Sequence, residues 1–516
     1  MRIGLVPLDE RPANVRYPKA IADIAGADIV LPPAEALGSR RSPGRHDRLA
    51  EWLGDVSPTL DALVVSIEQL GYGGLIPSRT THDPVASVLT RLEVLRGIRG
   101  RGRGPIVYGF NLVTRVSNSR DGWEESPYWP ELGPRLYRLS QTMDRASTDP
   151  LGKAEATALR AGLPGDAVGD WLRRRARNHT VNLAAIQLLA EGVLDRLVLS
   201  SDDTSPLGLP AREKRSLEEW AERLEVGDRL LMYPGADEVG SALTARAVNE
   251  HHGRVPRFAP CYAVPGGDEV TAAFEDGPVR MTIERQVRAI GGALSDACDD
   301  GATWLGVNPP LPGGPEWPPL PGTVPDPERS AALATLVEEA RSRLRAGQPV
   351  AVADVAYPNG ADPALIDLLR GQRWLLGLAA YGGWNTAGNT IGTVLAQASA
   401  LGRGRGEGQV AANERFLLHR LMEDWGYQQT VRPRVRDWLV VEMGRPEPDE
   451  DGIAAAEAWI EPRLAPTIED LDAFAGRWRI VPGSVRLPWG RTFEVDFDLE
   501  PAPEAQPAGS PEEPGT

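Results

Sequence analysis

The chain has 516 residues, of which 41% are hydrophobic and 25% charged, and its formal net charge is −16. This length fits one large α/β domain with an accessory region, because single hydrophobic cores stop growing at roughly 250–300 residues. The negative charge disfavours nucleic acid as a partner, since phosphate binding requires a basic face. The two cysteines, Cys261 and Cys298, are too few for a disulfide framework or a thiolate zinc site.

The N-terminal residues favour a cytoplasmic protein. Charged Asp9, Glu10 and Arg11 follow the first apolar run at once, which leaves no room for the hydrophobic region of a signal peptide. No later run approaches the roughly 20 apolar residues that a membrane span needs. We therefore expect a small-molecule or oligosaccharide substrate as the partner, with neither nucleic acid nor membrane involved, and the sequence leaves the oligomeric state open.

Short apolar runs bounded by turn residues alternate with stretches of helical spacing, which is the pattern of βα units around a parallel sheet. Nine runs fit strands: 3–8, 62–67, 106–110, 197–199, 230–233, 258–263, 304–307, 350–355 and 375–380. A closed barrel of eight strands needs one fewer, so one run is a hairpin strand or an insertion. The predicted fold class is α/β, with a TIM-barrel-like main domain.

Helical spacing is clearest between these runs and again after them. The predicted helices are 85–96, 169–191, 216–224, 241–250, 329–346 and 363–370. Asp362 and Pro363 mark the start of the last one, because an aspartate N-cap before a proline favours a helix N-terminus. We predict a catalytic domain at 1–402, a small α+β accessory region at 411–500 and a disordered tail at 501–516, where Pro, Glu, Gly and Ala lack periodicity.

Polar clusters follow nearly every apolar run, and parallel sheets build their sites at that edge. The candidate substrate-binding residues from the first three strands are Asp9, Arg11, Glu68, Tyr72, Arg79 and Asn111, and those from the later strands are Asp237, Glu238, Asp354, Asn359, Trp384, Asn385 and Asn389. Each has a structural alternative: Asp9 and Arg11 fit a capped helix start, the glycine-rich loops fit tight turns, and Asp237 and Glu238 fit a helix N-terminus.

The strand predicted at 197–199 leads into Asp202 and Asp203, the candidate catalytic residues. Two carboxylates at a strand end can sit in environments that split their pKa values and so divide acid from base roles. Adjacent aspartates are also common in loops. No cofactor is expected, because neither a P-loop nor a well-placed dinucleotide fingerprint is present, and none of the six histidines falls in a metal-binding motif.

Five motifs together resemble an uncharacterised bacterial family, domain of unknown function 4127. They are PLDERP at 7–12, YGGLIPSR at 72–79, SDD at 201–203, YPGADE at 233–238 and YGGWNTAGN at 381–389. The resemblance covers most of the chain and implies no established activity. A weaker resemblance is to barrel glycosidases acting on N-acetylhexosamines, which implies that Asp202 orients the substrate's acetamido group and Asp203 is the general acid.

Three functional hypotheses follow. The first is a carbohydrate-active hydrolase that uses Asp202 and Asp203 for acid/base or substrate-assisted cleavage. The second is a metal-dependent hydrolase acting on a phosphorylated or small polar metabolite, with Asp9, Asp202, Asp203 and Asp237 as oxygen ligands. The third is a non-catalytic sugar-binding protein, which would show saturable binding without product.

Overall fold

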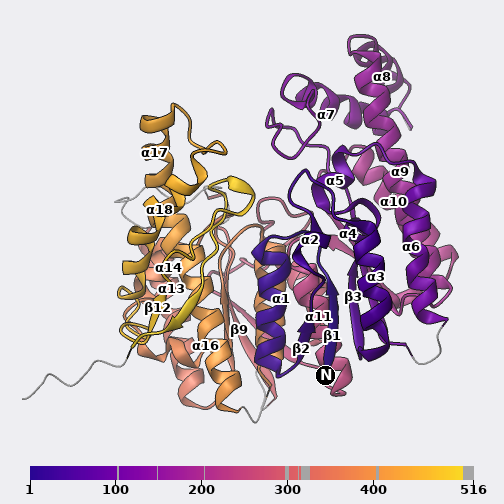
Figure 1. Ribbon diagram of the computed structural model, residues 1–516. Helices are drawn as coiled ribbons and strands as arrows, with labels where there is room; N and C mark the ends of the chain where they lie inside the picture. The colour runs from indigo at the N-terminus through magenta and orange to yellow at the C-terminus, as the bar shows by residue number, and fades with distance from the viewer. Residues whose placement is uncertain are drawn as a thin grey trace, which may run out of the picture.

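The computed structural model describes residues 1–100, 104–147, 149–202, 204–296, 301–311, 313–314, 326–402 and 406–503. Two parallel sheets form the centres of two halves that stand side by side (Figure 1). The predicted α/β class with parallel strands is confirmed. The predicted disordered tail lies mostly outside the described residues.

The first sheet belongs to the N-terminal half, and all of its neighbouring strands are parallel. In spatial order it contains β2 (Asp28–Val30), β1 (Arg2–Val6), β3 (Ala62–Ser66), β4 (Ile106–Val113), β5 (Arg196–Ser201) and β6 (Leu230–Pro234). The buried, β-branched run ALVVS of β3 is typical of an inner strand covered on both faces.

The second sheet is also entirely parallel and repeats the strand order of the first. From one edge it contains β8 (Ala293–Leu294), β7 (Arg257–Tyr262), β9 (Ala302–Asn308), β10 (Val350–Asp354) and β11 (Ala380–Gly382). In both sheets the second strand along the chain lies outside the first, and the later strands add on the other side. Such an order has a point where the chain reverses direction across the sheet, and ligands bind outside the carboxyl ends of the strands there.

A closed barrel is not found among the described residues. The strands divide between two open sheets, and no pairing joins β6 to β7. In a barrel β1 would pair with the last strand, whereas here β1 lies between β2 and β3. Apolar runs separated by helices predict parallel strands in either architecture, so the sequence pattern alone did not distinguish two open sheets from one barrel.

Helices cover both sheets. The N-terminal half contains α1 (Pro12–Ala25), α2 (Ala34–Leu37), α3 (His46–Val56), α4 (Ile67–Tyr72), α5 (Leu75–Thr80), α6 (Val85–Arg99), α7 (Trp129–Arg145), α8 (Pro150–Ala161), α9 (Gly165–Ala190), α10 (Leu209–Arg223) and α11 (Val239–His251). The second half contains α12 (Val279–Ala289), α13 (Pro327–Arg345), α14 (Pro363–Leu369), α15 (Ala387–Ala400), α16 (Glu407–Leu421), α17 (Arg432–Met443) and α18 (Ile453–Leu464). In the described part of the chain, no helix combines the length and apolar character needed to cross a membrane.

The two halves meet through packed helices. Helices α1 and α11 of the first half pack against α15, and α1 also packs against α16 (Figure 1). Helix α15, with the sequence AGNTIGTVLAQASA, is buried along its whole length, and its small side chains permit close approach of neighbouring helices. One hydrophobic core contains side chains from both sheets, so the halves are not independently packed bodies.

The C-terminal residues pack against the second half and return to the first. Strands β12 (Trp478–Ile480) and β13 (Leu499–Pro501) pair antiparallel, and Ile480 and Phe497 belong to the same core as Trp304 of β9. Between these strands, residues 488–494 (the C-terminal crossing segment) reach the carboxyl edge of the first sheet, where Trp489 donates a hydrogen bond to Glu10 at 2.8 Å.

The predicted elements agree with the structure except in a few places. The first eight apolar runs contain strands, but the run 375–380 is mainly a 3₁₀ helix (Arg373–Gly377) that precedes β11. The alternating pattern of the sequence at 492–497 also suggests a strand, but the strand that pairs is β13, further along the chain. The short strands β2 and β8 were not predicted, since three and two residues show too little periodicity.

Candidate functional site

Arg11 stands at the carboxyl end of β1, in the turn that leads into α1. Asp9 shapes this turn by accepting the backbone N–H of Arg11 at 3.0 Å, and Pro12 then begins the helix. The Arg11 side chain folds back and donates to both carboxylate oxygens of Asp9, with the shortest N–O distance at 2.8 Å. Both side chains are buried. The turn therefore carries a paired charge rather than a free one.

Asp237 joins Arg11 from the end of β6, although three strands separate β6 from β1. Helix α11 begins two residues later and packs against α1, which brings the β6–α11 loop back across the sheet edge. Asp237 accepts from Arg11 at 2.6 and 3.2 Å, and Asn14 donates to Asp9 at 2.9 Å. We call Asp9, Arg11, Asn14, Asp237 and the nearby Glu494 the Arg11 cluster.

Electrostatics favour the ionised guanidinium in the Arg11 cluster. Burial alone would lower the pKa of Arg11, but the charges of Asp237 and Asp9 raise it well above its ordinary value. Glu494 lies 3.8 Å from Arg11, and burial raises the pKa of Glu494 to about 7. A buried guanidinium shared by several carboxylates is strongly stabilised as a unit, and removing it would leave buried negative charges without a partner.

The second half of the molecule completes the Arg11 cluster. Asn385 donates to Asp237 at 3.1 Å, and the side-chain oxygen of Asn389 accepts the Asp237 backbone N–H at 3.2 Å. Asn389 is on the first turn of α15, which Thr386 caps. Five of the residues predicted for substrate binding (Asp9, Arg11, Asp237, Asn385 and Asn389) are therefore brought together where the two halves meet.

A second cluster surrounds Glu124, which is on the loop between β4 and α7. Arg79 donates to Glu124 at 2.8 Å, Arg115 at 3.0 Å and Arg491 at 2.5 Å. Burial alone would raise the pKa of Glu124, but the charges of these three arginines hold it well below its ordinary value. We call Arg79, Arg115, Glu124, Arg491 and Asp202 the Glu124 cluster, because Asp202 forms an ion pair with Arg79.

Glu68 lies beside the Glu124 cluster, at the end of β3. It is on the first turn of α4, which Ser66 caps by accepting the Gln69 backbone N–H at 3.1 Å. One carboxyl oxygen accepts the Leu112 N–H at 2.7 Å, and the other has no hydrogen-bond partner among the residues that the structure describes. Burial raises the pKa of Glu68 to about 8. The backbone hydrogen bonds and the charge of Arg79 lower this pKa by less, and the charge of Asp202 raises it further. The acid is therefore mostly protonated at pH 7.

The C-terminal crossing segment was missed as part of the site. The guanidinium of Arg11 lies 4.3 Å from the Trp489 ring centre, and that of Arg491 lies 4.8 Å away. Arg491 also lies 3.6 Å from Glu494 and so connects the two clusters. The motif PWGR at 488–491 gave only a turn signal in the sequence, because nothing local indicates that it contacts residues 367 and 479 positions away.

Three predicted residues of the first half make structural contacts apart from both clusters. The Tyr72 ring packs under the guanidinium of Arg177 at 4.6 Å. Asn111 donates to Asn182 of α9 at 2.6 Å. Glu238 accepts from Gln286 at 2.8 Å, and burial raises its pKa to about 7.

The remaining predicted residues belong to the second half. Asp354 accepts from Asn308 at 2.9 Å, and burial together with the charge of Asp362 raises its pKa to about 8. The backbone N–H of Asn359 donates to the Asn385 carbonyl at 3.2 Å, which ties two loops together. Trp384 lies beside Phe493 of the C-terminal crossing segment, with 5.5 Å between ring centres. Asp203 falls outside the described residues.

The proposed oxygen ligands for a metal are separated. Asp9 and Asp237 share Arg11, whereas Asp202 pairs with Arg79. A guanidinium between two carboxylates already supplies the positive charge that a cation would bring. Over the part of the chain that the structure describes, no group of three or more His, Cys, Asp or Glu side chains is arranged to hold a metal ion.

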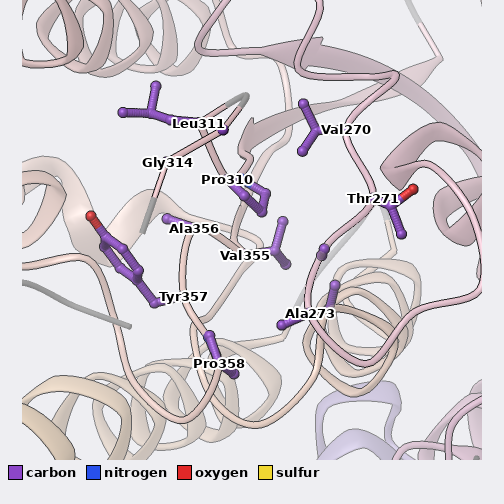
Figure 2. Close-up of a pocket in the computed structure, with 13 residues that line it drawn as sticks. Val270, Thr271, Ala273, Pro310, Leu311, Gly314, Val355, Ala356, Tyr357 and Pro358 are labelled. Atoms are coloured by element: carbon purple, nitrogen blue, oxygen red, sulfur yellow. The ribbon is translucent and has the colours of Figure 1, made fainter. Parts of the chain in front are cut away.

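A cavity of about 260 Å³ opens at the carboxyl edge of the second sheet. Its walls come from residues 270–273 after β7, from the loop after β9 and from residues 355–358 after β10, so it lies where the chain reverses across the sheet. Figure 2 shows Tyr357 and Pro358 across the hollow from Val270 and Thr271. Apart from Thr271 and Tyr357 the lining side chains are apolar or glycine, and the charged residues of the two clusters are not among the residues that line it.

Comparison with known proteins identifies the family. A family model described as "Protein of unknown function (DUF4127)" matches residues 3–498. The chain belongs to the DUF4127 family. This match confirms the resemblance carried by the five motifs, all of which lie within the matched residues. No curated protein and no solved structure matches the chain.

Proposed function

We propose that this DUF4127 protein is a hydrolase acting on a small polar substrate of the sugar class, with Glu68 and Asp202 as its pair of working carboxyl groups. The observation that carries the proposal is the contrast between these two groups, which follow β3 and β5 on either side of β4. Glu68 is buried and has a raised pKa of about 8, whereas Asp202 is ion-paired with Arg79 and partly exposed. Two carboxyl groups in opposed environments are the usual basis for dividing acid and base roles.

Glu68 is the proposed proton donor. Among the described residues its second carboxyl oxygen has no hydrogen-bond partner, and its neutral form can give a proton to a leaving oxygen at pH 7. Only 1% of Glu68 is exposed. The proposal therefore requires that a covering segment, such as the loop carrying Glu124, moves when substrate enters.

Asp202 is the proposed base or stabilising carboxylate. Arg79 forms an ion pair with it and fixes its direction at the end of β5. Substrate binding is supported by the amide side chains at the junction of the two halves and by Trp123, which is partly exposed and packs on Arg40 at 4.3 Å. The pairing of Asp202 with Asp203 as acid and base stays a prediction.

Turnover by matched variants tests this proposal. Wild type, Glu68→Gln and Asp202→Asn would be screened on chromogenic glycosides, N-acetylhexosaminides and glucuronides included, and on phosphate esters, each with and without chelator. We expect Glu68→Gln to lower turnover about 10²–10⁴-fold, the usual range for a lost general acid. Wild-type activity should fall as the pH rises through about 8, because Glu68 then loses the proton it donates.

Asp276→Asn is the control variant, since Asp276 also pairs with two cations, Lys214 and Arg285, but belongs to neither cluster. It should keep wild-type turnover. Full activity of Glu68→Gln on a substrate that the wild type cleaves would contradict the proposal. Saturable binding of a sugar without any product would favour the non-catalytic alternative, and chelator-sensitive release of phosphate would favour the metal-dependent one.

A further inference from the structure

The Glu124 cluster has the form of an occupied anion site. Arg79 comes from α5, Arg115 from the loop after β4 and Arg491 from the C-terminal crossing segment, so three distant parts of the chain converge on one carboxylate. One Glu124 oxygen accepts from Arg79 and Arg115, and the other accepts from Arg491. Guanidinium groups bind carboxylate and phosphate oxygens in this way when they recognise a ligand.

The charge balance shows what the site would do without Glu124. Asp202 remains on Arg79 and Glu125 remains on Arg115 at 3.2 Å. Burial raises the pKa of Glu125, and Glu494, which faces Arg491, has a pKa of about 7 and also faces Arg11. Removing Glu124 therefore leaves the three guanidiniums with incomplete compensation, and a bound anion would restore the balance.

Glu124 is on a loop of irregular structure that is fixed at its two ends. Residues 114–128 contain neither helix nor strand, and the side chain of Glu124 is 16% exposed. Near Glu124 the loop is held by Arg41, which donates to the carbonyls of Gly122, Trp123 and Glu125 at 2.5 to 3.1 Å. The two ends of the loop are fixed by Arg175, which donates to the Thr114 carbonyl at 3.0 Å, and by Tyr128, which donates to Asp170 at 2.8 Å. The stretch between these ends is not part of either sheet, so it can shift without disturbing the sheet beneath it.

We propose that the substrate carries an anionic group, a carboxylate or a phosphate, which binds Arg79, Arg115 and Arg491 in the place that Glu124 occupies in this structure. The inference rests on the proposed function, because it names the substrate class for the same site. When the anion displaces Glu124, the part of the loop around Glu124 moves outward and Asp202 becomes accessible. Substrate can then reach Glu68 only after an anion has bound. A neutral sugar does not displace Glu124.

Equilibrium binding without turnover tests the inference. The probes are inorganic phosphate, D-glucuronate and neutral D-glucose, titrated by calorimetry into wild type, Glu124→Ala and the matched Asp276→Ala. We expect Glu124→Ala to bind phosphate or glucuronate at least tenfold more tightly than wild type does, while glucose binding stays unchanged and Asp276→Ala behaves as wild type. Phosphate binding alone would identify a phosphorylated substrate, and glucuronate binding alone would identify an acidic sugar.

A second variant keeps the result interpretable if Glu124→Ala is less stable. Adding Arg491→Gln to Glu124→Ala should remove the gained affinity, whereas adding the exposed-site change Glu218→Gln should not. The inference is overturned if Glu124→Ala gains no anion affinity, or if Asp276→Ala gains as much. These binding experiments do not measure turnover. A negative result would therefore reject the anion site without testing the acid/base roles of Glu68 and Asp202, which the activity screen tests separately.

Discussion

Several carboxyl side chains in this protein are buried and have raised pKa values. Glu68, Glu275 and Asp354 each have a pKa near 8, chiefly because burial disfavours the charged form. Glu275 accepts the Gly388 N–H at 2.7 Å and faces the Thr282 hydroxyl at 3.4 Å. Such a site suits a neutral side chain better than an ionised one.

Replacing Glu275 by Gln should stabilise the protein at alkaline pH. Between pH of about 4.5, where the acid ionises in the unfolded chain, and about 8, the folded state keeps a proton that the unfolded state has lost, so stability falls as pH rises. Glutamine removes this loss. We expect a gain of about 1–2 kcal/mol in the free energy of unfolding at pH 8 and none at pH 4. Urea unfolding at both pH values measures it, with exposed Glu218→Gln as the neutral control. Equal effects at the two pH values would contradict the assignment.

At the scale of elements, the C-terminal crossing segment matters most, because it closes the first sheet's site from outside. Trp489 contacts Glu10 by a hydrogen bond and lies against both Arg11 and Arg491. Trp489→Ala should lower the free energy of unfolding by about 2–3 kcal/mol, since it removes aromatic packing and a hydrogen bond. Denaturant unfolding gives the value, and Val441→Ala, at a side chain 81% exposed on α17, should change nothing. A loss below about 0.5 kcal/mol would mean that the segment is only loosely placed.

The sequence predicted some helices and strands correctly and gave no indication of others. Buried runs such as that of β3 predicted strands well, because covered parallel strands are continuously apolar. The helix start at Asp362 and Pro363 was likewise correct. By contrast, local sequence patterns did not indicate the π-helix Met422–Val431 or the position of Trp489. Both depend on contacts with residues that are distant along the chain.

The site residues also divide into those that local sequence patterns predicted and those that depend on partners distant along the chain. Asp9, Arg11 and Asp237 were predicted because each follows a strand, and parallel strands bring their carboxyl ends to one edge. Arg115 and Glu124 follow the third predicted strand, and Glu124 lies in an acidic-aromatic stretch that suits sugar rings, but neither is among the predicted site residues, and Arg491 was not predicted at all. Ion pairs between loops are set by three-dimensional packing, so charge along the sequence did not indicate which arginine meets which acid.

At the scale of the whole molecule, two sheets of one strand order share a hydrophobic core through α1, α11 and α15. The halves should therefore unfold together. A fragment of residues 1–253 would expose the faces of α1 and α11 that α15 covers, and we expect it to show no cooperative thermal transition, in contrast to the full chain. Calorimetry of both proteins tests this, and a sharp transition in the fragment would show that the first half folds independently.

The proposed function depends most directly on Glu68 being a neutral acid at pH 7. Infrared difference spectra between wild type and Glu68→Gln, recorded from pH 5 to 10, isolate the carboxyl group of Glu68. The account predicts a protonated-acid carbonyl band that is present at pH 7 and disappears near pH 8. A carboxylate signal from Glu68 already at pH 6 would contradict it and remove the proton donor from the proposed mechanism.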